Sequence, residues 1–169
     1  MLADQLIDLL GFTNTDSPLI EAVKAQGGSI ESISPKKMRE IISDFIPFAD
    51  KGVELAFRPR EFYERDYGAP KGEGPYVMVA VFYFPNGSSK YSAYQGKVPL
   101  ATGPVTNRDQ AFAAFGKPEE TEEEDGQIYS DLWTVEGKLV HVDYHDDRSV
   151  ALITVGFPKR DTVELLPVD

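Results

Sequence analysis

The chain has 169 residues, 41% of them hydrophobic, and its 17 basic and 28 acidic residues give a net charge of −11. Because it contains no cysteine, disulfides, thiol nucleophiles and cysteine-ligated zinc sites are excluded. The negative charge disfavours nucleic acid and anionic membranes as partners and favours a cationic partner.

Length and composition predict a single domain over residues 1–169. The opening stretch MLADQLIDLLGF carries Asp4 and Asp8 and lacks both a basic start and a small-residue cleavage site, so it predicts an amphipathic helix rather than a signal peptide. No run approaches the roughly 18 to 20 apolar residues that span a bilayer. Together these observations predict a cytoplasmic protein.

Three helices are predicted in the first fifty residues. Residues 2–10 place leucines at helical spacing, and a second helix lies between Pro18 and Gly27. A third helix is predicted within residues 34–48, where Ser34 is the N-cap. Its inward-facing side chains would be Met38, Ile41, Ile42 and Phe45.

The pattern then changes to that of strands. Residues 53–57 alternate in polarity, and residues 76–84 are almost all β-branched or aromatic, which is typical of a central strand. Residues 58–75, rich in proline, glycine and charge, predict a long exposed loop. After a Pro-Asn-Gly turn, residues 89–99 are expected to return as an antiparallel strand.

The second half contains one predicted helix and three predicted strands. The helix lies within residues 106–118 and ends at Gly116. The strands read SDLWTV, KLVHVDYH and SVALITVGF, with short connections. The whole pattern predicts an α+β protein in which short helices pack on one face of an antiparallel sheet.

Acidic residues concentrate before these strands. Residues 117–131 contain seven acidic side chains and one lysine, a net −6 of the chain's −11. We predict that residues 119–125 form an acidic loop that contacts a basic partner, although a solvated connection has the same composition. The predicted partner-binding residues are Glu119, Glu120, Glu122, Glu123, Glu124, Asp125, Asp143, Asp146 and Asp147.

The two halves of the sequence are similar to each other. In each, a capped helix ends at glycine and two strands follow, the second ending in an aromatic residue and proline. The similarity leaves open a tandem structural duplication, with pseudo-repeats 2–90 and 91–169, or a chance recurrence of a common unit. The corresponding segments are 16–28 with 107–118, 52–57 with 138–144, and 76–85 with 149–158.

The second half also resembles known proteins. The order YQGKVPLATG, a capped helix ending in FGKP, a strand with Trp133, a strand ending in Asp-Tyr and a last strand ALITV is similar to small bacterial immunity-type proteins. The helix, Gly-x-Pro and tryptophan-strand unit is similar to the repeated module of beta-lactamase-inhibitory proteins and of small outer-membrane assembly lipoproteins. The resemblance covers residues 91–157, with a fainter similarity at 2–57. It implies a protein that binds and neutralises a cognate secreted toxin in the producing cell.

This chain departs from the pattern in two respects. VPLATGPV stands where a Pro-small-Leu turn is usual, and the chain lacks the cysteine to which a lipoprotein attaches its lipid. The second departure argues against the lipoprotein interpretation.

The tract HVDYHDD holds both histidines, His141 and His145, together with Asp143. On a strand these three side chains share one face, opposite Val142 and Tyr144, so we expect the valine and tyrosine to face the core. Three alternate side chains on one strand are hard to bring to a single zinc ion, because zinc–ligand distances are only about 2.0–2.2 Å. The tract therefore predicts the polar face of an amphipathic strand, and the alternative is a metal-dependent hydrolase.

No catalytic template appears elsewhere in the sequence. It contains no GxSxG, P-loop or GxGxxG motif. We therefore predict no enzyme, no cofactor and no bound metal. The preferred hypothesis is an immunity protein for a toxin with a basic surface, such as a nuclease, and an adaptor for a partner other than a toxin is a further alternative.

Overall fold

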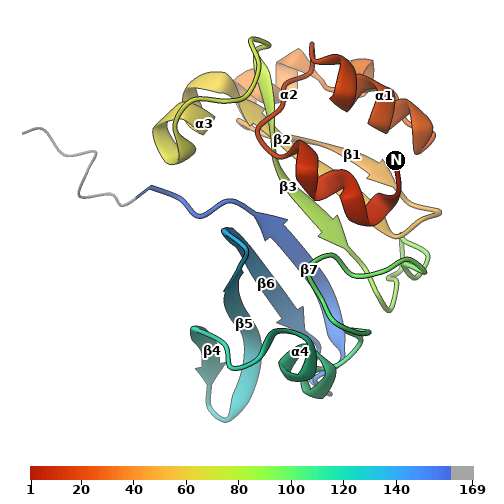
Figure 1. Ribbon diagram of the computed structural model, residues 1–169, viewed down its shortest axis with the longest axis vertical. Helices are drawn as coiled ribbons and strands as arrows, with labels where there is room; N and C mark the ends of the chain where they lie inside the picture. The colour runs from red at the N-terminus through yellow and green to blue at the C-terminus, as the bar shows by residue number, and fades with distance from the viewer. Residues whose placement is uncertain (161–169) are drawn as a thin grey trace, which may run out of the picture.

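A single antiparallel sheet of seven strands organises residues 1–160, the part of the chain that the computed structural model describes (Figure 1). The strands follow the spatial order β1-β2-β3-β7-β6-β5-β4. Their bounds are β1 (Asp44–Phe48), β2 (Val53–Pro59), β3 (Tyr76–Tyr83), β4 (Glu120–Glu124), β5 (Gln127–Val135), β6 (Lys138–Tyr144) and β7 (Val150–Gly156). The helices are η1 (Ala3–Leu9), α1 (Ser17–Ala25), η2 (Ile30–Ser32), α2 (Pro35–Glu40), α3 (Arg60–Tyr67) and α4 (Arg108–Phe115), where η denotes a 3₁₀ helix. The predicted α+β class is confirmed.

The two halves of the chain meet at the centre of the sheet. Residues 80–83 of β3 pair with residues 153–156 of β7, β2 and β6 flank this seam, and β1 and β5 lie outside them. The strand order is therefore mirrored about the seam, and β4 alone has no counterpart. This arrangement is compatible with the sequence similarity between the halves, whose origin by duplication stays a prediction.

The strand pairing at the seam relates the two halves with an offset that differs by one residue from their sequence alignment. The sequence alignment sets Val81 against Thr154, but in the sheet Val81 lies opposite Val155. A two-fold axis through the Val81–Val155 pair keeps the apolar faces of both halves on one side of the sheet. The same axis matches Gly52 with Gly137, whose φ angles of 69° and 78° lie in the left-handed region that favours glycine.

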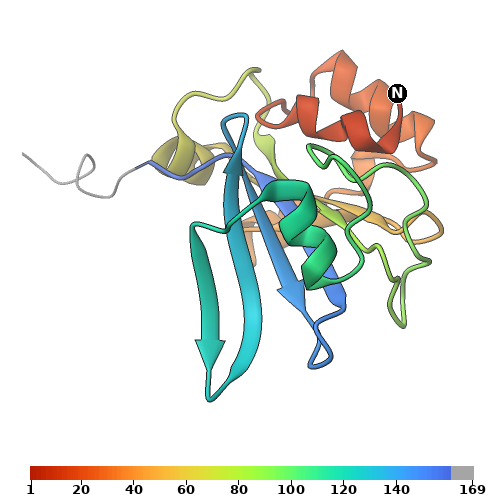
Figure 2. The same ribbon diagram turned by 60° about the horizontal axis from the view of Figure 1, so that its bottom comes forward.

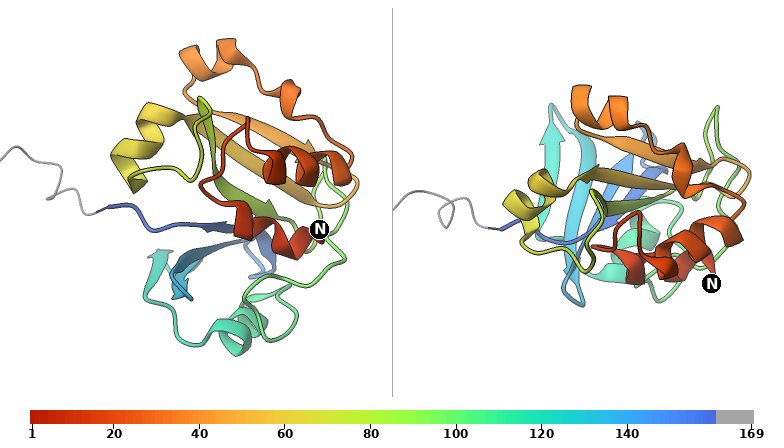
Figure 3. Two further views of the ribbon diagram at one scale, coloured as in Figure 1. Left: turned by 45° about the horizontal axis from the view of Figure 1, so that its top comes forward. Right: turned by 90° about the horizontal axis from the view of Figure 1, so that it is seen from above.

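The core lies between one face of the sheet and the helices η1, α1 and α4, which Figures 2 and 3 show on the same side of the strands. The hydroxyl of Tyr83 donates to the carbonyl oxygen of Ala3 in η1 at 2.8 Å, which ties this helix to β3. Each fully buried aliphatic side chain contributes about 1.5–3 kcal/mol. The core side chains of the sheet include Ile46, Phe48, Val53, Leu55, Phe57, Met78, Val81, Tyr83, Trp133, Val140, Val142, Ile153 and Val155.

The predicted ends of helices α1 and α4 agree with the structure. Pro18 lies in the first turn of α1, and Gly27 follows its C-terminus with φ of 91°. Asn107 caps α4, because its side chain accepts a hydrogen bond from the backbone N–H of Gln110. Gly116 ends α4 with φ of 86°.

The helix predicted within residues 34–48 is wrong beyond its first turns. Ser34 caps α2 as expected and Met38 is buried, but α2 ends at Glu40 and residues 44–48 form strand β1. Ile41 is 64% exposed and Phe45 42% exposed, so neither faces the core. The helical spacing of apolar residues continued by coincidence into a strand whose alternation begins at Asp44.

Two other predictions on this half are wrong. Residues 58–75 are not entirely loop, since α3 occupies residues 60–67 and buries Tyr63. Residues 89–99 do not form a strand, although the N–H of Tyr94 donates to the carbonyl oxygen of Phe84 at 2.9 Å. Within residues 1–160 no helix is both long and apolar enough to cross a membrane.

Candidate functional site

The acidic segment is a strand, so the prediction of a loop at residues 119–125 is wrong. Residues 120–124 form β4, which pairs with β5, and all five side chains are exposed. Glutamate has a low intrinsic preference for strands, so the pairing with β5 supplies the order. The hairpin turn holds Asp125 and Gly126 at φ of 52° and 79°, and Asp-Gly is a strong signal for such a turn in the sequence.

Strand β4 forms one edge of the sheet. Within the described residues no strand pairs with its outer side, so its outward N–H and C=O groups can pair with another chain. Glu120, Glu122 and Glu124 project to the sheet face opposite the core helices, whereas Thr121 and Glu123 project to the helix side. The opposite edge is β1, in which Pro47 has no N–H to donate.

The other predicted acidic residues lie at or near the same end of the sheet. Asp143 is half-buried on β6 and shares a cross-strand row with Ser130 and Glu122. Asp146 and Asp147 lie in the exposed turn between β6 and β7. Glu119 precedes β4, and its N–H donates to the carbonyl oxygen of Leu132 at 2.8 Å. The structure therefore gathers the predicted residues on one hairpin and the adjacent strand end.

The alternation predicted for the histidine tract is confirmed within β6. Val142 is fully buried and Tyr144 nearly so, whereas His141 and Asp143 point to the opposite face. His145 was expected to share their face, but β6 ends at Tyr144, so His145 lies beyond the strand. A register shift between Asp143 and Tyr144 interrupts the alternation at this point.

His141 and Asp143 form a partly exposed pair. Nδ1 of His141 lies 3.4 Å from Oδ2 of Asp143. The hydrogen bond to Asp143 raises the pKa of His141 above its ordinary value, and partial burial opposes this shift. Within residues 1–160 no group of three or more histidine or carboxylate side chains could hold a metal ion. The three residues of the hydrolase alternative are therefore not assembled into a metal centre.

We call the sheet face opposite the core helices the open face. The described helices leave it uncovered except at its margin, where the end of α3 borders it (Figure 3). Its two sides differ in chemistry. The acidic half consists of Glu120, Glu122, Glu124 and Asp143. The apolar half, on β1 to β3, carries Phe45, Ala56, Ala80 and Phe82, and Glu54 lies opposite Phe82 on the same face, where it accepts a hydrogen bond from the hydroxyl of Tyr91.

One acidic residue of the segment 117–131 has a different environment. Asp131 is fully buried on the helix side of β5, where its carboxylate faces Arg108 of α4 with Nε–Oδ2 and Nη2–Oδ1 distances of 2.8 and 3.1 Å. It also accepts hydrogen bonds from the hydroxyls of Thr121 and Tyr144. No sequence pattern predicted this network, because its members lie far apart along the chain and Asp131 is one of many acidic residues.

The network holds Asp131 in its charged form. Burial alone raises the pKa of Asp131, but the hydrogen bonds from Arg108, Thr121 and Tyr144 outweigh burial, and the pKa lies below its ordinary value. Burial and the bond to Asp131 raise the pKa of Tyr144. The four side chains join α4, β4, β5 and β6 to one another. This cluster therefore stabilises the acidic hairpin from the helix side of the sheet.

The face assignment of β6 predicts opposite responses to mutation. Val142→Ala is expected to lower the free energy of unfolding by about 1–4 kcal/mol, because it truncates a buried side chain. His141→Ala is expected to change it by no more than about 0.5 kcal/mol, because that side chain is partly exposed. Chemical denaturation of the two variants and of the parent chain measures these changes in the free energy of unfolding. Equal destabilisation by both would contradict the assignment.

The open face combines an exposed acidic strand edge with an apolar patch. Its acidic groups are exposed along an available strand edge, and its apolar side chains lie at the other end of the same face, on β1 to β3. In the described residues every buried side-chain polar atom has a hydrogen-bond partner, so none is left free for a ligand in the interior. No known protein family, curated protein or solved structure matches this chain.

Proposed function

We propose that this chain is a cytoplasmic immunity protein that binds and neutralises a secreted bacterial toxin with a basic surface. The observation that carries the proposal is the edge strand β4, five exposed residues of which four are glutamates, on a sheet face that helices leave uncovered. The resemblance of residues 91–157 to immunity-type proteins supports the same function.

The placement of charge suits such a partner. A toxin that acts on nucleic acid needs a basic cleft to attract phosphate, and an acidic surface of similar extent would be attracted to that cleft. Long-range attraction mainly raises the association rate, whereas apolar contacts at the centre of the interface slow dissociation. The glutamates of β4 also repel a second copy of the same edge, which leaves the edge available for a partner of opposite charge.

The test is neutralisation and binding of the toxin domain encoded beside the gene of this chain. Co-expression is expected to protect cells from that toxin, and stopped-flow association is expected to slow as salt rises. The variant Glu120→Gln/Glu122→Gln/Glu124→Gln should reduce the association rate at low salt by about tenfold or more, because it removes three charges from the open face.

The matched control is Glu21→Gln/Glu31→Gln/Glu40→Gln, which removes three exposed charges from the helices of the first half. Its association rate is expected to stay within about twofold of the parent, since these charges lie away from the open face. Equal slowing by both variants would contradict the acidic half as the binding surface. Absence of protection and of binding would overturn the proposed function.

A further inference from the structure

The apolar half of the open face contains a cavity of about 270 Å³. Phe45 and Phe82 line one side of it and pack against each other, with ring centroids 6.1 Å apart. Ala56 and Ala80, which are directly opposite each other in the β2–β3 ladder, form its floor. Because Ala80 is followed across the ladder by Gly156, the small side chains leave space beside the paired rings. Phe45 remains 42% exposed at its mouth.

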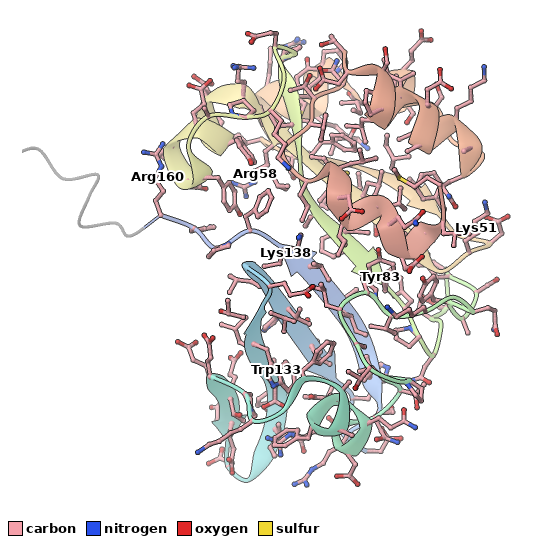
Figure 4. All side chains as sticks on the ribbon, viewed as in Figure 1. Lys51, Arg58, Tyr83, Trp133, Lys138 and Arg160 are labelled. Carbon is pink, nitrogen blue, oxygen red and sulfur yellow. The ribbon has the colours of Figure 1, made fainter. Side chains whose placement is uncertain are left out.

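Charged groups surround this cavity but are largely paired with one another. Asp66 at the end of α3 lies 3.9 Å from Nζ of Lys159 and 3.2 Å from Nε of Arg65. Tyr67 and Arg58 complete the side next to α3 (Figure 4 labels Arg58 beside this helix). The apolar walls and floor favour an uncharged occupant. The guanidinium of Arg58 favours an aromatic ring over an aliphatic side chain.

A continuous row of side chains joins this cavity to the acidic strand. Successive cross-strand partners on the open face are Phe82, Thr154, His141, Leu132 and Glu120. Four steps between neighbouring strands correspond to on the order of 20 Å. An interface of ordinary size, about 800 Å² on each partner, covers that distance. A partner drawn to the glutamates of β4 therefore also reaches the cavity.

We infer that this cavity receives an aromatic side chain of the partner whose basic surface faces the acidic half. The inference rests on the proposed function, since charge complementarity at β4 is what places a partner on this face. The aromatic side chain acts as the buried anchor of the interface and governs the lifetime of the complex. The acidic half governs the rate at which the complex forms.

A small probe tests the cavity without the toxin. The amide spectrum of the ¹⁵N-labelled chain is recorded while N-acetylphenylalanine amide is added, with N-acetyllysine amide as the control probe. Saturable shifts are expected at Ala56, Ala80 and Thr154 with the aromatic probe only. Ala80→Phe, which fills the cavity, should weaken probe binding at least tenfold, and so should Phe45→Ala, which removes one of the lining rings. Ala113→Phe adds the same atoms to the exposed side of α4 and should leave binding unchanged.

The toxin complex provides the second measurement. Ala80→Phe is expected to raise the dissociation rate at least tenfold while the salt dependence of association stays as in the parent chain. If the toxin binds the parent and Ala80→Phe equally well, the cavity inference is overturned and the proposed function stands. If the parent chain binds no toxin, the proposed function fails and with it the assignment of the occupant to the toxin.

Two spectroscopic outcomes also overturn the inference. One is the absence of saturable shifts from the aromatic probe, or shifts confined to the separate cavity around residues 93–97. The other is a set of shifts at Ala56 and Ala80 that depends on protein concentration without any probe. That result would identify a second copy of the chain as the occupant.

Discussion

Asp131→Ala is expected to lower the free energy of unfolding by about 3–5 kcal/mol, the usual loss when one partner of a buried ion pair is removed. The substitution leaves the guanidinium of Arg108 without its carboxylate and the hydroxyls of Thr121 and Tyr144 without their acceptor. Chemical denaturation at pH 7 measures the loss. A loss below about 1 kcal/mol would show that solvent can replace Asp131 in this network.

The pH dependence separates the charge of Asp131 from its shape. A carboxylate whose folded pKa lies below its unfolded value stabilises the protein above the unfolded pKa of about 4, and this contribution is lost as the pH falls through the folded pKa. The parent chain should therefore be more stable than Asp131→Asn at pH 7, with the difference shrinking below about pH 4. The control Asp146→Asn removes an exposed carboxylate and should give no comparable difference.

Trp133→Ala is expected to cost about 3–5 kcal/mol, as is usual for truncation of a large buried aromatic side chain. Trp133 is 2% exposed and lies between β5 and α4 (Figure 4), with its ring centroid 5.3 Å from that of Phe115 and 6.1 Å from that of Phe112. Its Nε1–H donates to the carbonyl oxygen of Gly116 at 2.9 Å. Because Trp133 is the only tryptophan, circular dichroism rather than fluorescence should follow the melt.

Two further variants locate the source of this loss. Trp133→Phe keeps a ring against α4 but removes the donor to Gly116, so it should cost less than Trp133→Ala. Thr134→Ala alters the exposed neighbour on the open face and should change stability by no more than about 0.5 kcal/mol. If Trp133→Ala were as mild as Thr134→Ala, the packing of α4 on the sheet would not depend on the tryptophan.

Segments whose burial and local pattern agree could be predicted from the sequence. β3, β6 and β7 each have a neighbouring strand on both sides and one face in the core. They are therefore rich in β-branched and aromatic residues, and this apolar pattern indicates a buried strand. The caps of α1 and α4 are local, so Pro18 and Asn107 marked them correctly. The core-facing orientation of Val142 could be predicted from the two-residue alternation of side chains along a strand alone.

The errors arose where a distant partner determines the local structure. Strand β4 consists mostly of glutamates, and only its ladder with β5 makes it a strand. The Asp125–Gly126 turn was a local signal of that hairpin, although the abundance of charge around it suggested a loop. Asp131 could not be distinguished from its acidic neighbours, because its burial depends on Arg108, which belongs to a helix earlier in the chain. The acidic half was thus identifiable by composition, whereas the buried hydrogen-bond network around Asp131 that stabilises it was not.

The two edges of the sheet resist fibril formation by different means. At β1 the obstacle is covalent, since Pro47 lacks a backbone donor at every pH. At β4 it is electrostatic, because the glutamates repel an incoming copy of the same strand. Salt screens this repulsion but cannot supply the missing donor at β1. High salt therefore weakens the protection at one edge only, and aggregation at high salt proceeds through pairs joined β4 to β4. Such pairs leave β1 at both outer ends, which limits their growth into longer assemblies.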